Sequence, residues 1–184
     1  VMDRADHTVL LQQLLAALQS QDKPASAALP VFLSGHMCHA PKPEILDAIE
    51  RCGARVVGDD LYTGYRYIST DVETDATPMD ALVNWYLQRN ENVPCPTRSS
   101  RNLDWDSYIL DCAQQQGAHG VILLQVKFCE PQLYFYPDIK NTLDANGMPH
   151  LLIETEHEEI PMEALITRLE TFVEVAQMQA RKRA

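Results

Sequence analysis

The sequence is poor in basic residues. It has 15 Lys and Arg against 26 Asp and Glu, which gives a formal net charge of −11 at pH 7. A phosphate-binding face needs clustered basic side chains, so the composition argues against a nucleic-acid partner. The one basic cluster in the sequence is Arg181-Lys182-Arg183, at the end of the last predicted helix. Positive charge there suits the helix macrodipole and needs no ligand.

Long apolar runs and common cofactor motifs are also missing. No run approaches the ~20 apolar residues that a membrane-spanning helix needs. No signal peptide is recognisable, because the first predicted helix is studded with polar residues. GxxxxGK[ST] and GxGxxG are both absent, which argues against a phosphate-binding loop of either kind. We therefore expect no membrane partner.

The five cysteines do not form a familiar framework. They are Cys38, Cys52, Cys95, Cys112 and Cys129, an odd number at wide and irregular spacings. This pattern does not fit a secreted disulfide scaffold, so we expect a reduced, cytoplasmic compartment. CxxC is absent as well, and a self-contained zinc or ferredoxin-type site therefore has no support in the sequence.

Short strand-like segments alternate with helical segments along the chain. Strands are predicted at 29–33, 55–58, 121–126 and 149–154, and helices at 3–20, 43–52, 78–89, 104–116, 133–146 and 161–182. Residues 61–77 lack periodicity and are predicted to form a long loop. Alternation of this kind indicates parallel pairing with right-handed crossovers. The predicted fold is α/β: a four-stranded parallel, doubly wound (flavodoxin-like) sheet in the order 2-1-3-4, flanked by helices.

The amino-terminal segment is predicted to be an amphipathic helix. Leucines recur there at helical spacing and form one apolar face, namely Leu10, Leu11, Leu14, Leu15 and Leu18. We expect residues 1–29 to form this helix and a linker, and residues 30–184 to form the α/β domain. Because the chain enters a helix almost at once, we also expect it to be the carboxyl-terminal part of a longer polypeptide.

Cys129 occupies the most informative position in the sequence. It follows the apolar run 121–126, which predicts a buried parallel strand. Open α/β sheets bind ligands beyond the carboxyl ends of their strands. A thiolate at this place could be a nucleophile, a redox partner or a metal ligand. The alternative is that Cys129 is simply a small hydrophobic residue.

The segments after the other strands carry further polar side chains. In 34–39, His36, Cys38 and His39 have metal-ligand chemistry, but they share no face of a regular element, and incidental histidines in a loop are the stronger interpretation. Gly35 favours a tight turn or a close approach of a ligand to the backbone. Asp59 and Asp60 could bind a ribose hydroxyl or a cation, although capping of the next turn is favoured.

Two further groups leave alternatives open. The residues Tyr62, Tyr65, Arg66 and Tyr67 either form a pocket wall or belong to a loop that packs its own aromatic rings. Cys95 lies between two prolines with arginines nearby, which would lower the pKa of a preorganised thiol. Its alternative is an unreactive thiol in a surface loop. We expect Cys52 and Cys112 to be core residues on helices.

Several segments together resemble one known family. They are ARVVGDDL at 54–61 with GYR at 64–66, VPCP at 93–96, 120–131 ending in KFCEP, GMPHLLIE at 147–154, and TRLETF at 167–172. Their order and content resemble the carboxyl-terminal domain of the 2-hydroxyacyl-CoA dehydratase and benzoyl-CoA reductase family. The resemblance covers essentially residues 30–175, and KFCEP is its most specific part.

The resemblance implies a cofactor and a ligand. Cys129 matches the third cysteine ligand of a [4Fe-4S] cluster whose other two cysteines lie in an amino-terminal domain that this chain does not supply. Cys95 is kept as a further candidate ligand. The residues expected to surround the cluster or the substrate are Ser34, Gly35, His36, Lys127, Phe128 and Glu130.

The resemblance also implies partners and a reaction. Enzymes of this family are heterodimers of two related subunits, and an iron–sulfur activator that hydrolyses ATP supplies single electrons. The electron passes through the cluster to a CoA thioester. Dehydratases then remove water from the thioester, whereas the reductases reduce its aromatic ring. Two alternatives remain: a non-catalytic binding or assembly domain without a cluster, and a stand-alone thiol enzyme that uses Cys129 or Cys95. The sequence does not separate dehydratase from ring reductase.

Overall fold

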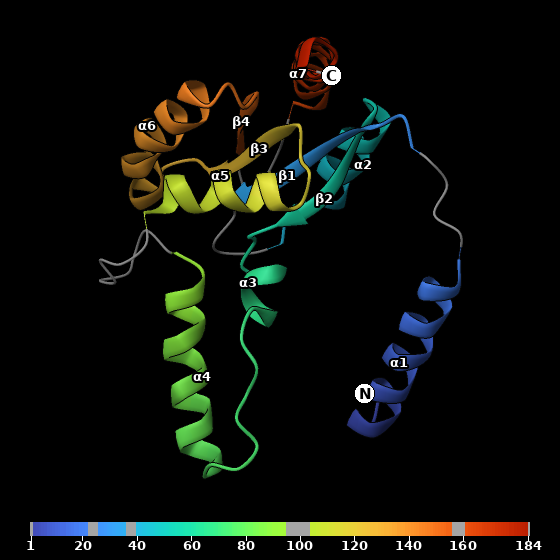
Figure 1. The fold of residues 1–184 in the computed structure, drawn as a ribbon, viewed down its shortest axis with the longest axis vertical. Helices are drawn as coiled ribbons and strands as arrows, with labels where there is room; N and C mark the ends of the chain where they lie inside the picture. Colours follow the sequence, from blue (N-terminus) through green and yellow to red (C-terminus); the bar gives the residue numbers. More distant parts are fainter. Residues whose placement is uncertain (1, 22–25, 36–39, 95–103, 156–160, 184) are drawn as a thin grey trace.

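The computed structural model describes residues 2–21, 26–35, 40–94, 104–155 and 161–183 (Figure 1). The elements along the chain are α1 (Arg4–Ser20), β1 (Leu29–Gly35), α2 (Pro43–Arg51), β2 (Ala54–Asp59), α3 (Tyr65–Ile68), α4 (Pro78–Asn92), α5 (Trp105–Gln115), β3 (Gly120–Val126), α6 (Glu130–Ala145), β4 (His150–Thr155) and α7 (Met162–Arg183).

The four strands form one parallel sheet in the order β2-β1-β3-β4. This confirms the predicted α/β class and strand order. The central strands β1 and β3 are buried along most of their length, as expected where helices cover both faces of a parallel sheet. In register, Gly35 pairs with Leu124, so both strands reach the same edge of the sheet.

Helices cover the two faces of the sheet and form two separate cores. On one face α2 and α7 pack on side chains such as Leu33 and Ile122. On the other, α5 and α6 pack on Phe32 and Val121. Each fully buried aliphatic side chain stabilises the fold by ~1.5–3 kcal/mol relative to an exposed one. These two layers hold the carboxyl edge of the sheet in place.

Several element boundaries differ from the sequence prediction. Helix α6 begins at Glu130 instead of 133, because Pro131 falls in its first turn, where no intrahelical N–H is needed. Helix α4 continues to Asn92 instead of ending at 89. The predicted loop 61–77 contains the short helix α3, which begins where the Asp59 Oδ1 atom accepts the Tyr65 N–H at 2.9 Å.

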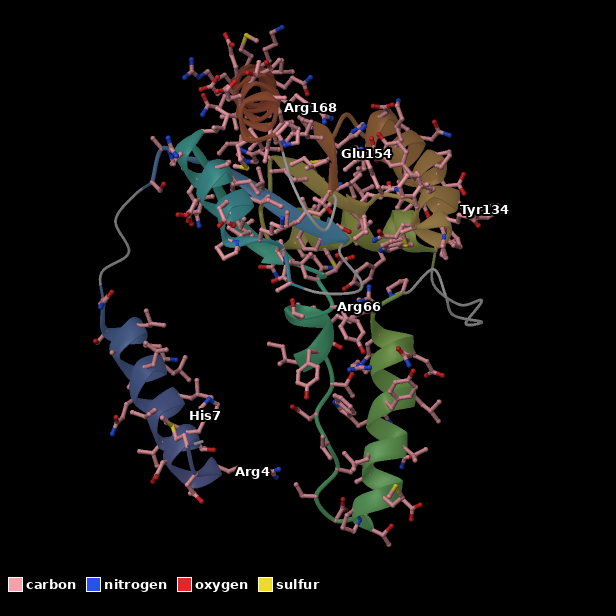
Figure 2. All side chains as sticks on the ribbon, turned by 180° about the vertical axis from the view of Figure 1, so that it is seen from behind. Arg4, His7, Arg66, Tyr134, Glu154 and Arg168 are labelled. Atoms are coloured by element: carbon pink, nitrogen blue, oxygen red, sulfur yellow. The ribbon has the colours of Figure 1, made fainter. Side chains whose placement is uncertain are left out.

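Two helices lie largely outside the cores. No residue of α1 is buried, and its leucines are about half exposed, so the predicted helix is confirmed while its apolar face has no core to join. Helix α4 extends away from the sheet in Figures 1 and 2 and buries only Ala81 and Arg89. Among the described residues, no helix combines the length and apolar character that crossing a bilayer requires.

Candidate functional site

Cys129 lies in a tight turn between β3 and α6, which we call the Cys129 turn (residues 127–130). The Cys129 N–H donates to the Val126 carbonyl at 3.1 Å, and the Glu130 N–H donates to the Phe128 carbonyl at 3.0 Å. Cys129 is the N-cap residue of α6, and its thiol makes no capping hydrogen bond. The side chain is half-buried. A thiol placed this way can reach a ligand at the carboxyl edge of the sheet.

Phe128 is strained and exposed in this turn. Its φ is 63°, and it is the only non-glycine residue with positive φ among those that the structure describes. Its side chain is 90% exposed. The left-handed conformation costs ~1–2 kcal/mol for a residue with a Cβ, and an exposed ring recovers little of that by burial. A conformation that stability does not explain points to a role at a site. Lys127 and Glu130, the first and last residues of the turn, are exposed as well.

Replacement of Phe128 by Gly is expected to stabilise the fold or leave it unchanged. Glycine adopts positive φ without a Cβ clash, and its extra freedom in the unfolded chain offsets part of the gain. We expect the free energy of unfolding in urea to rise by up to about 1 kcal/mol. Phe128→Ala keeps the Cβ and serves as the control. A loss of more than about 1 kcal/mol in Phe128→Gly would show that the ring packs on something that stabilises the fold.

A second centre of the site is the buried carboxylate of Asp60, just past the end of β2. Asp60 is fully buried. One oxygen accepts the Gly35 N–H at 3.0 Å, and the other accepts the Ser34 hydroxyl at 3.0 Å and the Trp105 indole N–H at 3.2 Å. We call these four residues the Asp60 network. It fastens the end of β1 and the start of α5 to the end of β2.

The electrostatics of Asp60 are set by opposing effects. Burial raises the pKa of the Asp60 carboxyl, while the nearby Arg66 guanidinium and the three hydrogen-bond donors lower it. Arg66 is itself buried and donates from Nη1 to the Val93 carbonyl at 2.7 Å. Arg66 lies where α3 and α4 approach the sheet (Figure 2). The two charges therefore couple the sheet edge to helices α3 and α4.

The sequence analysis favoured capping of the next turn by the paired carboxylates. This prediction is right for Asp59 and wrong for Asp60. Asp59 Oδ1 caps the following turn, accepting the N–H groups of Leu61 at 3.0 Å and Tyr65 at 2.9 Å. Asp60 instead points into the sheet edge and binds groups far away in sequence. Adjacent residues near a strand end point in opposite directions, so only one of the two carboxylates can serve the local turn.

Gly35 is required by a close approach of two strands. Its φ is 104°, and a Cβ at this position would lie 2.0 Å from the Leu124 carbonyl oxygen. The group that approaches the Gly35 backbone is the neighbouring strand β3; the approach of a ligand there stays a prediction. This contact fixes where β1 leaves the sheet and enters the segment 36–39.

The tyrosines of 62–67 pack mainly against α4. Arg89 is 4% exposed, and its guanidinium carbon lies 4.6 Å from the Trp85 ring centroid, 5.6 Å from that of Tyr62 and 5.9 Å from that of Tyr67. Such cation–π contacts hold the loop against the helix. The alternative of a loop that packs its own aromatics therefore applies to Tyr62 and Tyr67. Tyr65 differs, because it lines a groove of about 470 Å³ beside Cys112.

The structure brings together part of the predicted site. Ser34 and Gly35 line one small recess with Gln132, whose N–H donates to the Cys129 carbonyl at 3.1 Å. The end of β1 therefore lies beside the first turn of α6, the helix that Cys129 caps. His36, Cys38, His39 and Cys95 lie outside the described residues. Sequence reasoning missed the roles of Asp60, Trp105, Gln125 and Gln132. No local pattern marks the last three, and the paired carboxylates at 59–60 gave no sign that Asp60 is buried.

The described residues do not form a complete metal site by themselves. No three His, Cys, Asp or Glu side chains come together there to hold an ion. Cys129 can therefore supply one thiolate to a metal group, with the remaining ligands from elsewhere. The described part of the site offers one half-buried thiol, a cation at Lys127, and a rigid edge fixed by the Asp60 network.

Comparisons with known proteins identify relatives along nearly the whole chain. Residues 1–176 match the sequence model of the family described as 2-hydroxyglutaryl-CoA dehydratase, D-component. The chain is 29% identical over 173 residues to the (R)-phenyllactyl-CoA dehydratase beta subunit of Clostridium sporogenes, covering 94% of the chain and 45% of that protein.

Two further relatives are similar over a comparable length. A benzoyl-CoA reductase subunit of Thauera aromatica is 23% identical over 175 residues, or 95% of the chain and 45% of that protein. The beta subunit of lactoyl-CoA dehydratase of Anaerotignum propionicum is 25% identical over 176 residues, or 95% and 46%. The chain thus spans about half the length of these relatives. It belongs to the 2-hydroxyglutaryl-CoA dehydratase D-component family.

Proposed function

We propose that this chain is part of one subunit of a 2-hydroxyacyl-CoA dehydratase or benzoyl-CoA reductase, and that Cys129 is one cysteine ligand of its [4Fe-4S] cluster. The observation that carries the proposal is the position of Cys129. Its half-buried thiol lies in the turn between a central strand and a helix N-terminus. Ligand sites of open α/β sheets occur at this edge. The family membership supports the reaction class.

The residues present fit one corner of such a cluster. Iron–sulfur clusters are held by thiolates, and the Cys129 thiol is not engaged in capping α6. The other ligands would come from beyond the described residues, where Cys95 is a candidate, or from another part of the polypeptide. When bound, the cluster would supply single electrons to the CoA thioester.

The neighbours of Cys129 have separate tasks in this proposal. Lys127 places a positive charge two residues away, which would offset the negative charge of thiolate-bound iron. The exposed ring of Phe128 would cover the site and limit the access of water. The Asp60 network and the close approach of Gly35 to β3 hold the end of β1, so that Ser34 keeps a fixed place at this edge of the sheet.

The proposal also includes partners. The relatives are named as subunits of larger enzymes, so we propose a related partner subunit, a CoA thioester substrate and an ATP-hydrolysing iron–sulfur activator. We further propose that the enzyme works in the cytoplasm. Because the chain covers 45% of the first relative, the complete activity requires sequence beyond these residues.

Thiol alkylation before and after iron removal tests the proposal in the full-length protein. We expect Cys129 to resist the reagent while iron is bound and to react once a chelator has removed it, because a metal-bound thiolate is not a free nucleophile. Peptide mass spectrometry measures each cysteine separately. Equal labelling of Cys129 in both states would contradict its role as a ligand.

Cys52 and Cys112 serve as internal controls in this measurement. Both are half-buried and pack against the two cores from their margins, so the predicted core position is right only in part. Burial is the main cause that raises the pKa of each thiol above its usual 9.0. Since the thiolate is the reactive form, both should label slowly at neutral pH with or without iron. Their rates should rise only as the pH passes above about 9.

An assembly domain without a cluster is the second candidate. The observation in its favour is the apolar surface of α1 and α4, where large side chains are about half exposed: Leu10, Leu11, Leu14, Leu82, Tyr86 and Leu87. Exposed faces of this kind mark interaction surfaces. A full-length protein that binds its partner subunit but never holds iron would favour this alternative.

A further inference from the structure

A small recess lies between the Asp60 network, strand β3 and helix α6. Its lining includes Ser34, Gly35 and Trp105 from the network and Gln125 and Gln132 from β3 and α6. The recess has a volume of about 20 Å³. A single water needs ~10–15 Å³ by the same measure, so there is room for one. No larger ligand fits this space.

The two glutamines that line the recess have polar atoms without a hydrogen-bond partner. Gln125 is 4% exposed and Gln132 is 5% exposed. Within the described part of the chain, Gln125 Nε2 and Gln132 Oε1 are buried and make no hydrogen bond. One is a donor and the other an acceptor. Unpaired buried polar atoms are costly, and native structures pair them with protein groups or ordered water.

We propose that one water molecule occupies this recess and bridges Gln125 Nε2 to Gln132 Oε1. Water donates two hydrogen bonds and accepts two, so it satisfies both side chains even if either amide is rotated to exchange its oxygen and nitrogen. Buried waters typically make about three such bonds. Ser34 also lines the recess and could provide a third polar partner.

The water would connect the two sides of the Cys129 turn. Gln125 lies four residues before Cys129 on β3, and Gln132 lies three residues after it in the first turn of α6. The Gln132 N–H also donates to the Cys129 carbonyl. A bridge between these side chains would fix the angle at which the helix leaves the strand. Gln125 and Gln132 are then positioning residues for the thiol, and this last step rests on the proposed role of Cys129.

A crystal structure or water–amide NMR contacts would observe the water directly in the iron-free chain. We expect one ordered water within hydrogen-bond distance of both Gln125 Nε2 and Gln132 Oε1. An empty recess would overturn the proposal, as would a direct hydrogen bond between the two amides. Neither observation depends on iron. The water can therefore be absent while the cluster proposal stands, and it can be present even if the cluster proposal fails.

A double-mutant cycle with Gln125→Met and Gln132→Met tests the bridge by its energetics. Each single change is expected to lower Tm by about 2–4 °C, the shift that follows the loss of one buried hydrogen bond in a chain of this size. The double variant should lose no more than the larger single loss, because both changes remove the same bridge. Gln114→Met, exposed on α5, is the matched control and should leave Tm unchanged. Fully additive losses, or no loss in either single variant, would overturn the bridge.

The positioning role has its own readout in the iron-loaded protein. Gln132→Met is expected to retain iron and to change the electron paramagnetic resonance spectrum of the reduced cluster, because the thiolate would approach iron at a different angle. Gln114→Met should leave the spectrum unchanged. An unchanged spectrum in Gln132→Met would overturn the positioning role.

Discussion

Replacement of Cys129 by Ser in the full-length protein is expected to remove iron and ATP-dependent turnover while leaving the fold intact. If three cysteines hold the cluster, this change removes one third of the thiolate anchors. A serine oxygen is a harder and more basic ligand than a thiolate and holds this iron poorly. The fold should survive because the thiol is only half-buried and makes no capping bond, and the core comes from the sheet and its helices.

Three measurements separate the outcomes for Cys129→Ser. Iron content and the visible absorption of the cluster should fall together, turnover should vanish with them, and urea unfolding should stay within about 1 kcal/mol of the wild type. Cys52→Ser is the matched control, since Cys52 precedes β2 at the opposite edge of the sheet. Full iron and full turnover in Cys129→Ser would end the cluster assignment and favour the assembly domain.

Replacement of Asp60 by Ala is expected to give the largest loss of stability among single changes at the sheet edge. Three buried donors, from Ser34, Gly35 and Trp105, lose their acceptor at once. Arg66 also keeps a buried charge without the nearby carboxylate that compensates it. We expect the free energy of unfolding in urea to fall by about 3–5 kcal/mol.

The adjacent carboxylate provides the control for this prediction. Asp59→Ala removes two hydrogen bonds that cap a local turn, and its cost is expected to be about 1 kcal/mol. The two variants differ by one position and remove the same group, so their difference isolates the buried network. Equal losses in the two variants would show that the Asp60 network contributes no more than a cap.

The pH dependence of stability gives Asp60 a second signature. Burial raises its pKa above the ordinary 3.8, so the folded state holds the Asp60 proton more tightly than the unfolded state does. The stabilisation that this bound proton gives the folded state is fully present below pH 3.8 and is lost as the pH rises through the raised pKa. Asp60→Asn does not titrate. The stability of the wild type relative to Asp60→Asn should therefore decline as the pH rises above about 4.

The sequence by itself determined the architecture and the place of the key thiol. Apolar runs such as 121–126 are too short for helices and alternate with amphipathic segments, and this pattern admits few arrangements besides a parallel sheet. Pro43 and Gly53 mark the ends of a helix by their own backbone preferences. Cys129 comes three residues after the end of a buried strand, so its place at the carboxyl edge of the sheet could be predicted without any long-range contact.

Only the tertiary structure decided what lies around that thiol. Asp60 looks like its neighbour Asp59 in sequence, yet its partners Ser34 and Trp105 are 26 and 45 residues away. Gln125 and Gln132 carry no motif, and their unpaired atoms follow from the burial that β3 and α6 impose. The left-handed backbone of Phe128 arises where a strand must turn abruptly into a helix. Local preference fixes elements, whereas the partners of a buried polar group depend on which strands and helices the fold brings side by side.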